Sequence, residues 1–241
     1  MCQLPIAHCR LNSNIMPIYQ LTKALIFPHP NEAIEDGLLA IGGDLTISRL
    51  LLAYSNGIFP WYSEEDPIMW WSPDPRQILF PDAFKISKTL SKTIENKKFK
   101  ISIDSIFPTV IENCAKTPRK GQKGTWITKE MRNAYIALHK AGYAHSFETW
   151  NKNELVGGLY GLSLGKAFFG ESMFFHETDA SKVALFYLVE FCKKHGFHFI
   201  DTQVKTTHLK SFGAEEIPRK EFLTLLAKTL QYETLVGNWI L

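Results

Sequence analysis

The 241-residue sequence lacks the features of a disulfide-stabilised, zinc-stabilised or membrane protein. Its four cysteines show no Cys-x-x-Cys pair and no regular spacing, which argues against a structural zinc and fits a reducing compartment. No apolar run approaches the roughly 20 residues needed to cross a bilayer. No basic segment leads into an apolar one at the N-terminus, so we expect no signal peptide. These absences predict a cytoplasmic protein that does not enter a membrane.

The sequence also lacks the common signatures of cofactor sites. Neither G-x-x-x-x-G-K-[S/T] nor G-x-G-x-x-G occurs, so binding of ATP or of a dinucleotide has no motif support. The eight histidines show no metal-like pairing, and a lone histidine is more often a core or surface residue than a ligand. We therefore expect neither a metal nor a cofactor.

Charge is unevenly distributed, although the net charge is only +3. Residues 1–84 carry 4 basic and 9 acidic side chains, residues 85–132 carry 12 and 4, and the rest of the chain carries 11 of each. The central segment, at +8, could neutralise several phosphates, each of which adds a salt-dependent increment of affinity. A solvated, lysine-rich helix face followed by a loop also explains this charge, and charge runs are more often solvated surface than binding patches.

Hydrophobic periodicity predicts an α+β protein. Residues 27–81 are dense in Gly and Pro, which favours turns and short elements, with one helix at 48–56. Apolar spacing then predicts helices at 85–97, 105–116, 128–142, 179–196 and 218–230, and strands at 145–150, 153–165, 166–175 and 197–203. The first three strands form an antiparallel meander with turns near residues 151–153 and Gly165.

The composition and periodicity along the chain predict that it has three parts. Residues 1–16 show no periodicity and form an N-terminal arm, and Met16 is a possible alternative start. Residues 17–98 form a small N-terminal domain. Residues 99–241 form a larger domain with an antiparallel-rich mixed sheet and packed helices.

Polar residues interrupt two of the apolar strands. In the strand at 197–203, a period of two places Asp201 and Gln203 on one face, where they either cap the next loop or act on a ligand. The same alternation places Glu171 and Met173 on one face beside Gly170. A buried Glu171 needs a partner or shifts its pKa upward, and such groups concentrate at functional sites, although backbone amides would also satisfy it.

Aromatic residues gather beside the Gly and Pro turns. Exposed rings on a rigid loop can stack on an unpaired base for about 1 to 3 kcal/mol each, but the same rings can equally form the core of a small domain. For Trp70 and Trp71 we favour the core. The others are Tyr54, Phe59, Trp61 and Trp126.

Ten strings, in chain order, resemble the leucyl/phenylalanyl-tRNA–protein transferase family. They are GLLAIGGDLT, GIFPWY, WWSPDPR, GTWIT, HSFETW, ELVGGLYG, GESMF, DASK, IDTQ and GAEEIPR. The resemblance extends over about residues 27–230, and ten strings in order are specific where no single one is.

The resemblance implies an aminoacyltransferase that moves Leu or Phe, and also Met, from aminoacyl-tRNA to the α-amino group of proteins beginning with Arg or Lys. This reaction marks the acceptor protein for degradation. It implies Leu-tRNA, Phe-tRNA and such proteins as partners, and a larger domain resembling the GCN5-type N-acetyltransferase fold. An activated ester donor needs neither ATP nor a covalent nucleophile. We expect a monomer.

The resemblance also implies residue roles. The implied catalytic residues are Asp201, Gln203 and Glu171. The residues implied to contact the aminoacyl-adenosine are Tyr54, Trp61 and Trp126. The pocket for the amino-acid side chain is implied to comprise Leu159, Phe168, Met173, Leu185, Leu188 and Ile200. Together with the charge pattern, the resemblance suggests that the tRNA backbone contacts Lys85, Lys88, Lys92, Arg119, Lys120 and Lys123.

Two other functions remain open from the residues. An acetyl-CoA-dependent N-acetyltransferase would share the fold, but the R/Q-x-x-G-x-G/A segment expected before its long helix is absent. A non-catalytic RNA-binding protein would use the basic segment and the aromatic loops, and would leave Asp201, Gln203 and Glu171 without a role.

Overall fold

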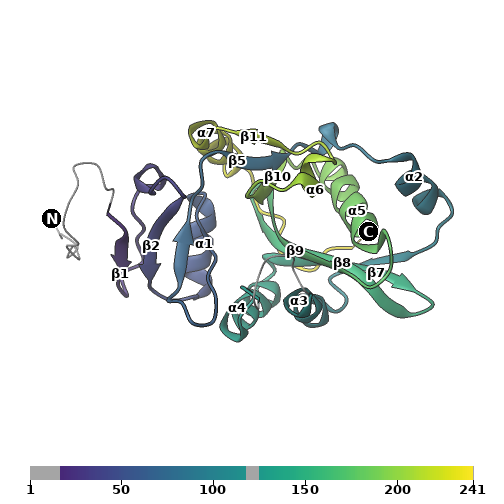
Figure 1. Ribbon diagram of the computed structural model, residues 1–241, viewed down its shortest axis with the longest axis horizontal. Helices are drawn as coiled ribbons and strands as arrows, with labels where there is room; N and C mark the ends of the chain where they lie inside the picture. The colour runs from purple at the N-terminus through teal and green to yellow at the C-terminus, as the bar shows by residue number, and fades with distance from the viewer. Residues whose placement is uncertain (1–16, 118–124, 241) are drawn as a thin grey trace.

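The computed structural model describes residues 17–117 and 125–240, and the strands within them form one four-stranded and one seven-stranded sheet. The molecule is elongated, with the small sheet near one end and the large sheet in the other part (Figure 1). The small sheet has the order β1-β2-β4-β3. Its elements are β1 (Tyr19–Leu21), η1 (Pro30–Glu32), β2 (Leu38–Gly42), α1 (Ile47–Ser55), β3 (Phe59–Pro60) and β4 (Met69–Trp71).

Local signals fix the ends of α1 and the packing beside it. Thr46 caps the helix by accepting a hydrogen bond from the Arg49 backbone N–H, and Gly57 ends it at a φ of 70°. Trp70 is buried, and its Nε1 donates to the Gly42 carbonyl oxygen at 2.9 Å. The expectation that Trp70 belongs to the core is therefore confirmed.

The large sheet has the order β11-β5-β10-β9-β8-β7-β6, with β9 and β10 parallel and the other pairs antiparallel. The meander turns at Lys152 and Asn153, which both have positive φ, and again at Gly165. Its strands are β5 (Arg76–Leu79), β6 (Lys100–Ile103), β7 (Ala144–Asn151), β8 (Glu154–Leu164), β9 (Ala167–Phe175), β10 (Phe199–Gln203) and β11 (Glu215–Ile217).

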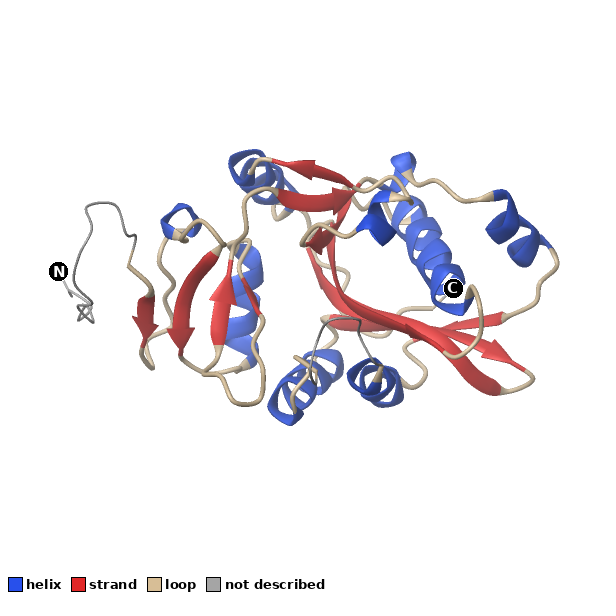
Figure 2. Ribbon diagram, viewed as in Figure 1, coloured by secondary structure: helices blue, strands red, loops and turns tan. Residues whose placement is uncertain are grey.

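Helices cover both faces of the large sheet (Figure 2). One face packs on α5, with α2 outside it, and the opposite face packs on α3 and α4. The core on the α3 and α4 side is continuous with the core of the small sheet, whereas the α5 side has a core of its own. The remaining helices are η2 (Pro81–Ala83), α2 (Lys88–Glu95), α3 (Phe107–Lys116), α4 (Lys129–Lys140), α5 (Ala180–Lys194), α6 (Thr207–Lys210) and α7 (Arg219–Thr229).

The α+β class, the helices and the meander predicted from the sequence are confirmed, although α2 is shorter than residues 85–97. The sequence did not reveal β5, β6, β11 or α6, nor the strands of the small sheet. One of these matters for the division of the chain, because β5 lies within residues 17–98 yet pairs with β10 and β11 in the large sheet. In the described residues, no helix is long and apolar enough to cross a membrane.

Candidate active site

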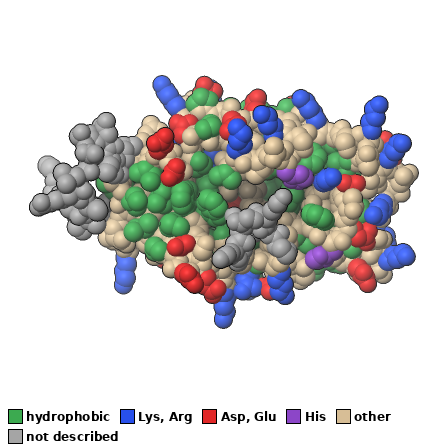
Figure 3. Space-filling view, viewed as in Figure 1, with side chains coloured by type: hydrophobic (Ala, Val, Ile, Leu, Met, Phe, Trp, Pro, Cys, Tyr) green, Lys and Arg blue, Asp and Glu red, His purple; other side chains and the backbone are tan. Residues whose placement is uncertain are grey.

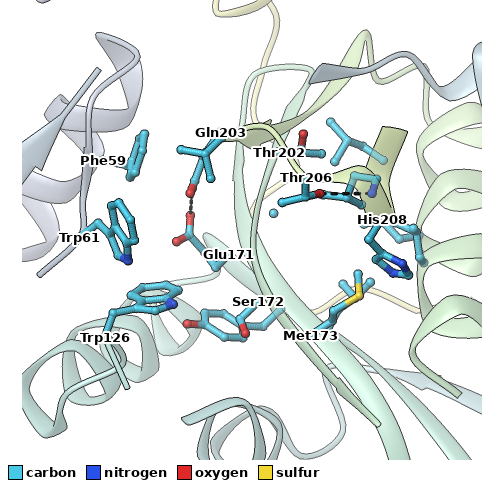
Figure 4. Close-up of a pocket in the computed structure, with 18 of the residues that line it drawn as sticks. Phe59, Trp61, Trp126, Glu171, Ser172, Met173, Thr202, Gln203, Thr206 and His208 are labelled. Carbon is cyan, nitrogen blue, oxygen red and sulfur yellow. Dashed lines mark hydrogen bonds between the residues drawn. The ribbon is translucent and has the colours of Figure 1, made fainter. Parts of the chain in front are cut away.

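The parallel strands β9 and β10 pair only briefly and then diverge. Their register joins Ala167 to Phe169 with Phe199 to Asp201, and beyond this point a cavity of about 350 Å³ opens between them. It is lined from β8, β9, β10, α5 and α6, and closed on one side by β3 and Trp126. Figure 4 shows its polar and aromatic lining residues. A splayed strand pair therefore creates the space that a ligand would need.

Glu171 is displaced from strand alternation by a bulge in β9. Tyr160 pairs with Ser172 but Gly161 pairs with Gly170, so Glu171 is the extra residue. Met173 packs with the core on the α5 side, whereas Glu171 contacts Tyr54, which belongs to the opposite core. The prediction that Glu171 and Met173 share one face is wrong because the bulge shifts the alternation by one residue.

Glu171 is held by hydrogen bonds in the wall of the cavity. Its Oε1 accepts from the Tyr54 hydroxyl at 2.6 Å and from Gln203 Nε2 at 2.9 Å. Burial raises the pKa of Glu171 to about 7, although hydrogen bonds from Tyr54 and Tyr135 act in the opposite direction. A carboxyl group with such a pKa can exist in either protonation state near neutral pH.

Gln203 faces Glu171 because its backbone is unusual. Its φ is 64°, and the pairing of β10 with β5 shifts between Asp201 and Gln203. The Gln203 backbone N–H donates to Asp201 Oδ1 at 2.9 Å. Strict alternation would have placed the two side chains together, but the structure directs them apart. Gln203 lines the cavity, and the fully buried Asp201 does not.

Asp201 instead pairs with Arg76, which no sequence pattern singles out. Arg76 on β5 donates from Nη2 to Asp201 Oδ2 at 2.7 Å, and from Nε to Oδ1 at 3.0 Å. Both side chains are buried, and the residues lie 125 positions apart. A Pro-rich segment followed by one arginine gives no sequence signal for this pairing.

Aromatic residues form one side of the cavity. Phe59, Trp61 and Trp126 line it, and the Glu171–Gln203 pair faces Trp61 in Figure 4. The Trp61 backbone is fixed because its carbonyl oxygen accepts a hydrogen bond from Trp71 Nε1 at 2.6 Å. The structure therefore brings Trp61 and Trp126 to the site as expected.

Tyr54 lies elsewhere than expected. Its ring is fully buried, and its hydroxyl contacts both Glu171 and the Tyr135 hydroxyl. Burial raises the pKa of Tyr54 well above its ordinary value, so the hydroxyl remains a donor to Glu171. A ring in this position cannot stack on a base, and Tyr54 supports Glu171 instead.

The deep part of the cavity is apolar. Five of the six side chains expected there line it: Leu159, Met173, Leu185, Leu188 and Ile200. The sixth, Phe168, is fully buried, and its ring lies 6.1 Å from that of Trp239. Phe168 therefore packs in the core on the α5 side and is not among the lining residues.

A polar edge of the cavity was not anticipated. Thr202, Thr206 and His208 line it along the β10–α6 connection. Thr206 caps α6 by accepting a hydrogen bond from the Leu209 N–H, and burial lowers the pKa of His208, as does the charge of Lys182. In the sequence, these threonines look like ordinary residues at the start of a helix. Their position at the cavity becomes evident only from the divergence of β9 and β10 in the structure.

Of the cationic residues expected to contact RNA, Lys85, Lys88 and Lys92 are exposed on or beside α2. Figure 3 shows Lys and Arg side chains along the edge of the molecule where α2 lies. The Lys85 N–H donates to the Phe212 carbonyl oxygen just after α6, which connects this surface to an element of the cavity wall. Arg119, Lys120 and Lys123 lie outside the described residues.

Two further kinds of site find no support in the described parts of the chain. No group of three or more His, Cys, Asp or Glu residues is arranged to hold a metal ion there. Residues 161–165 have the G-x-S-x-G spacing of a nucleophile elbow, but they belong to β8 and the turn into β9. Such an elbow joins a strand to a helix and exposes its serine, whereas Ser163 is fully buried.

Comparison with known proteins decides among families. A family model described as leucyl/phenylalanyl-tRNA protein transferase matches residues 78–227, and a model of that transferase's N-terminal domain matches residues 43–74. The leucyl/phenylalanyl-tRNA–protein transferase of Desulfatibacillum aliphaticivorans is 55% identical over 226 residues, which cover 94% of this chain and 97% of that protein. The chain belongs to the leucyl/phenylalanyl-tRNA–protein transferase family.

Other members of the family are similarly close. The leucyl/phenylalanyl-tRNA–protein transferase of Maridesulfovibrio salexigens is 53% identical over 225 residues, covering 93% of this chain and 94% of that protein. The segment matched by the N-terminal family model includes Tyr54 and Trp61. The segment matched by the larger model includes Trp126, Glu171 and Gln203. The cavity is thus assembled from both matched segments of this transferase family.

Solved structures are more distant. An aminoglycoside acetyltransferase from an uncultured soil metagenomic sample has a TM-score of 0.36 at 15% identity, covering 61% of this chain and 97% of that one. The L-PGS of Bacillus licheniformis has a TM-score of 0.36 at 14% identity, covering 71% and 57%. Similarity at this level says nothing about the substrate.

Proposed function

We propose that the protein transfers Leu, Phe or Met from aminoacyl-tRNA to the α-amino group of proteins that begin with Arg or Lys. The observation that carries this proposal is the cavity itself. In a chain of this family, an apolar chamber of about 350 Å³ leads to a polar Glu171–Gln203 pair, with two tryptophans beside it. The chamber suits an unbranched or branched apolar side chain, and the polar pair suits an amine and an ester.

The apolar chamber is the proposed site for the side chain of the transferred residue. Leu185 and Leu188 share a face of α5 and meet Met173 and Ile200 across the cavity. A hydrophobic pocket discriminates by about 1 to 3 kcal/mol per missing methylene, so Leu and Phe would be favoured over smaller residues. A methionine would fit because its flexible thioether fills a similar volume.

The two tryptophans are the proposed platform for the terminal adenosine. Trp61 and Trp126 both line the cavity, and Trp61 is fixed through its hydrogen bond to Trp71. Stacking of a base on an aromatic ring contributes about 1 to 3 kcal/mol. The exposed Lys85, Lys88 and Lys92 are the proposed contacts to the tRNA backbone, as are Arg119, Lys120 and Lys123.

The proposed chemistry is alignment followed by proton transfer. The amine attacks the ester carbonyl, an N–C bond forms, and the C–O bond to the 3′ oxygen of the ribose breaks. The amine proton passes to that oxygen through the neighbouring 2′-hydroxyl. Alignment alone can lower such a barrier by roughly 7 to 11 kcal/mol, so no covalent enzyme intermediate is required.

Gln203 and Glu171 are the proposed groups at the reacting atoms. Because Gln203 Nε2 donates to Glu171, the Gln203 carbonyl oxygen is the atom suited to accept a hydrogen bond from the incoming amine. An α-amino group has a pKa of about 7.7 to 8.0, so it needs only modest help to lose its proton. Asp201 would act on this step through Gln203, because it does not line the cavity.

The proposal also places the protein in the cytoplasm as a monomer that uses no cofactor. The test is transfer of labelled Leu from Leu-tRNA to a peptide beginning with Arg, beside a matched peptide beginning with Ala. We expect transfer to the first peptide alone, without ATP. Absence of transfer together with saturable acetyl transfer from acetyl-CoA would overturn the proposal, as would tRNA binding without any transfer.

A further inference from the structure

The Arg76–Asp201 ion pair is bidentate and buried. Arg76 Nε lies 3.0 and 3.2 Å from the two Asp201 carboxylate oxygens, and Nη2 lies 2.7 Å from Oδ2. The side chains are 1% and 0% exposed. Removing two charges from water carries a large desolvation cost, so a buried ion pair is weak evidence for a contribution to stability alone. Its geometry therefore calls for a functional explanation.

Two aromatic rings fix the orientation of the guanidinium. Arg76 Cζ lies 4.7 Å from the ring centroid of Phe59 and 4.7 Å from that of Phe222. Phe59 belongs to β3 and lines the cavity, whereas Phe222 belongs to α7 near the other end of the chain. Only a planar cation can lie between two rings and also bind a carboxylate with two nitrogens.

The fixed carboxylate in turn holds the backbone of Gln203. Asp201 Oδ1 accepts the Gln203 N–H at 2.9 Å, and Gln203 adopts a φ of 64°. A non-glycine residue in this region is strained, so it persists only where its surroundings impose it. In this conformation Gln203 Nε2 reaches Glu171 Oε1 at 2.9 Å. A chain of contacts thus leads from β5 to the cavity.

We propose that Arg76 is a positioning residue: it locks the Asp201 carboxylate, which holds Gln203 in the backbone conformation that presents its amide to the reacting amine. Arg76 touches no substrate, and it neutralises Asp201 so that this carboxylate serves as a hydrogen-bond acceptor and not as a base. The kinetic consequence rests on the proposed function. The structural consequence, a fixed Gln203 N–H, does not.

The kinetic test compares Arg76→Lys with Arg49→Lys. Arg49 is a matched control, because its side chain is also 1% exposed and bonded to an aspartate. Its partners are Asp44 and the Thr22 and Ala24 carbonyl oxygens, and not Asp201. We expect Arg76→Lys to lower kcat about 10- to 100-fold, since a misplacement of about 1 Å can cost about 100-fold, while KM for Leu-tRNA changes less than about twofold. Arg49→Lys should keep wild-type kcat below its unfolding temperature.

A double-mutant cycle asks whether Arg76 acts through Asp201. Asp201→Asn alone should lower kcat to a similar degree. The kcat of the variant carrying both Arg76→Lys and Asp201→Asn should lie within about threefold of the kcat of the less active single variant. Both changes loosen the same contact, so their effects should not multiply. Losses that multiply in the double variant would overturn the proposal.

Hydrogen exchange of the Gln203 amide tests the structural step without any assay of transfer. We expect Arg76→Lys to speed exchange of this N–H at least about tenfold relative to wild type, because its acceptor is released. The Ser146 N–H, which donates to Asp104 Oδ1 at 2.9 Å far from β5, should exchange unchanged. Unchanged exchange at Gln203 overturns the proposal, whether or not the wild-type protein transfers Leu. If the wild type transfers no Leu but Arg76→Lys still speeds exchange of the Gln203 N–H, the proposed function is overturned and the positioning role is not.

Discussion

At the scale of single residues, the buried carboxyl group of Glu171 makes stability depend on pH. The pKa of Glu171 rises from an ordinary 4.5 to about 7, chiefly through burial. Between these values the folded protein holds a proton that the unfolded chain has lost, so the free energy of unfolding must fall as pH rises through this window. Below about 4.5 both states are protonated, and above about 7 both are ionised, so the slope vanishes at either side.

We therefore expect Glu171→Gln, which keeps the shape and removes the ionisation, to lose this slope. Relative to the variant, the wild type should lose roughly 1 to 3 kcal/mol between pH 4.5 and 7.5, since one pKa unit corresponds to ~1.4 kcal/mol. Urea unfolding at several pH values measures this. Glu233→Gln, at an exposed position, is the control and should leave the wild-type slope in place. Parallel curves for wild type and Glu171→Gln would contradict the assignment.

A second prediction at the residue scale concerns Trp61. If its ring stacks on the terminal adenine, Trp61→Ala should raise KM for Leu-tRNA about 5- to 150-fold, because stacking contributes about 1 to 3 kcal/mol. Trp61→Phe keeps a smaller ring, so its KM for Leu-tRNA should lie between those of the wild type and Trp61→Ala. Steady-state transfer assays measure this effect. Trp150→Phe, on β7 and not lining the cavity, should leave KM unchanged. A normal KM in Trp61→Ala would exclude the platform role.

At the scale of elements, α5 shapes the apolar chamber. Leu188 is buried and lines the cavity, so Leu188→Ala should enlarge the chamber and cost about 2 to 5 kcal/mol of stability. The added space should favour Phe, raising the ratio of kcat/KM for Phe-tRNA to that for Leu-tRNA about 5- to 50-fold. Val189→Ala, buried on the same helix but away from the cavity, should destabilise without changing the ratio. If Leu188→Ala and Val189→Ala had the same ratio, Leu188 would not contribute to the choice between Phe and Leu.

The sequence predicted those elements whose pattern is local. Helices such as α5 and the meander β7 to β9 follow apolar spacing and turn residues, and they appear where expected. The bulges at Glu171 and at Asp201 to Gln203 could not be predicted, because each inserts a residue that a period-two pattern does not register. The catalytic roles of Asp201 and Gln203 remain predictions. Tyr54, which was expected to contact the aminoacyl-adenosine, is buried and donates its hydroxyl to Glu171.

Arg76 escaped sequence reasoning for a different reason. Its partner Asp201 lies 125 residues away, and its two stacking rings come from β3 and α7. No spacing in the chain encodes a contact of that kind. Pairing of β5 into the large sheet creates it, and β5 has only four residues. Long-range contacts made by short strands are thus the part of this site that needed a structure.

At the scale of the whole molecule, the two sheets share a core. The apolar cluster around α1 and Trp70 continues into α4 and the adjoining face of the large sheet. The division at residues 98 and 99 remains a prediction. The pairing of β5 with β10 and the gap between the family matches at residues 74 and 78 favour a division near β5. Either way, the cavity has walls from both sides of the division, so the N-terminal part is expected to be required for activity.

The last prediction concerns the charge distribution of the whole chain. If the basic surface on α2 contacts tRNA phosphates, the double variant Lys88→Glu and Lys92→Glu should weaken transfer at low substrate concentration. It should also flatten the slope of log kcat/KM against log salt by about 1 to 2, since each neutralised phosphate contributes about 0.7 to 0.9. The ratio of Leu to Phe transfer should stay fixed, because the apolar chamber is untouched. Lys193→Glu with Lys194→Glu changes the net charge equally at the other end of α5 and should keep the wild-type slope. Equal flattening in the two double variants would show that net charge governs binding, and a wild-type slope in both would show that Lys88 and Lys92 contact no phosphate.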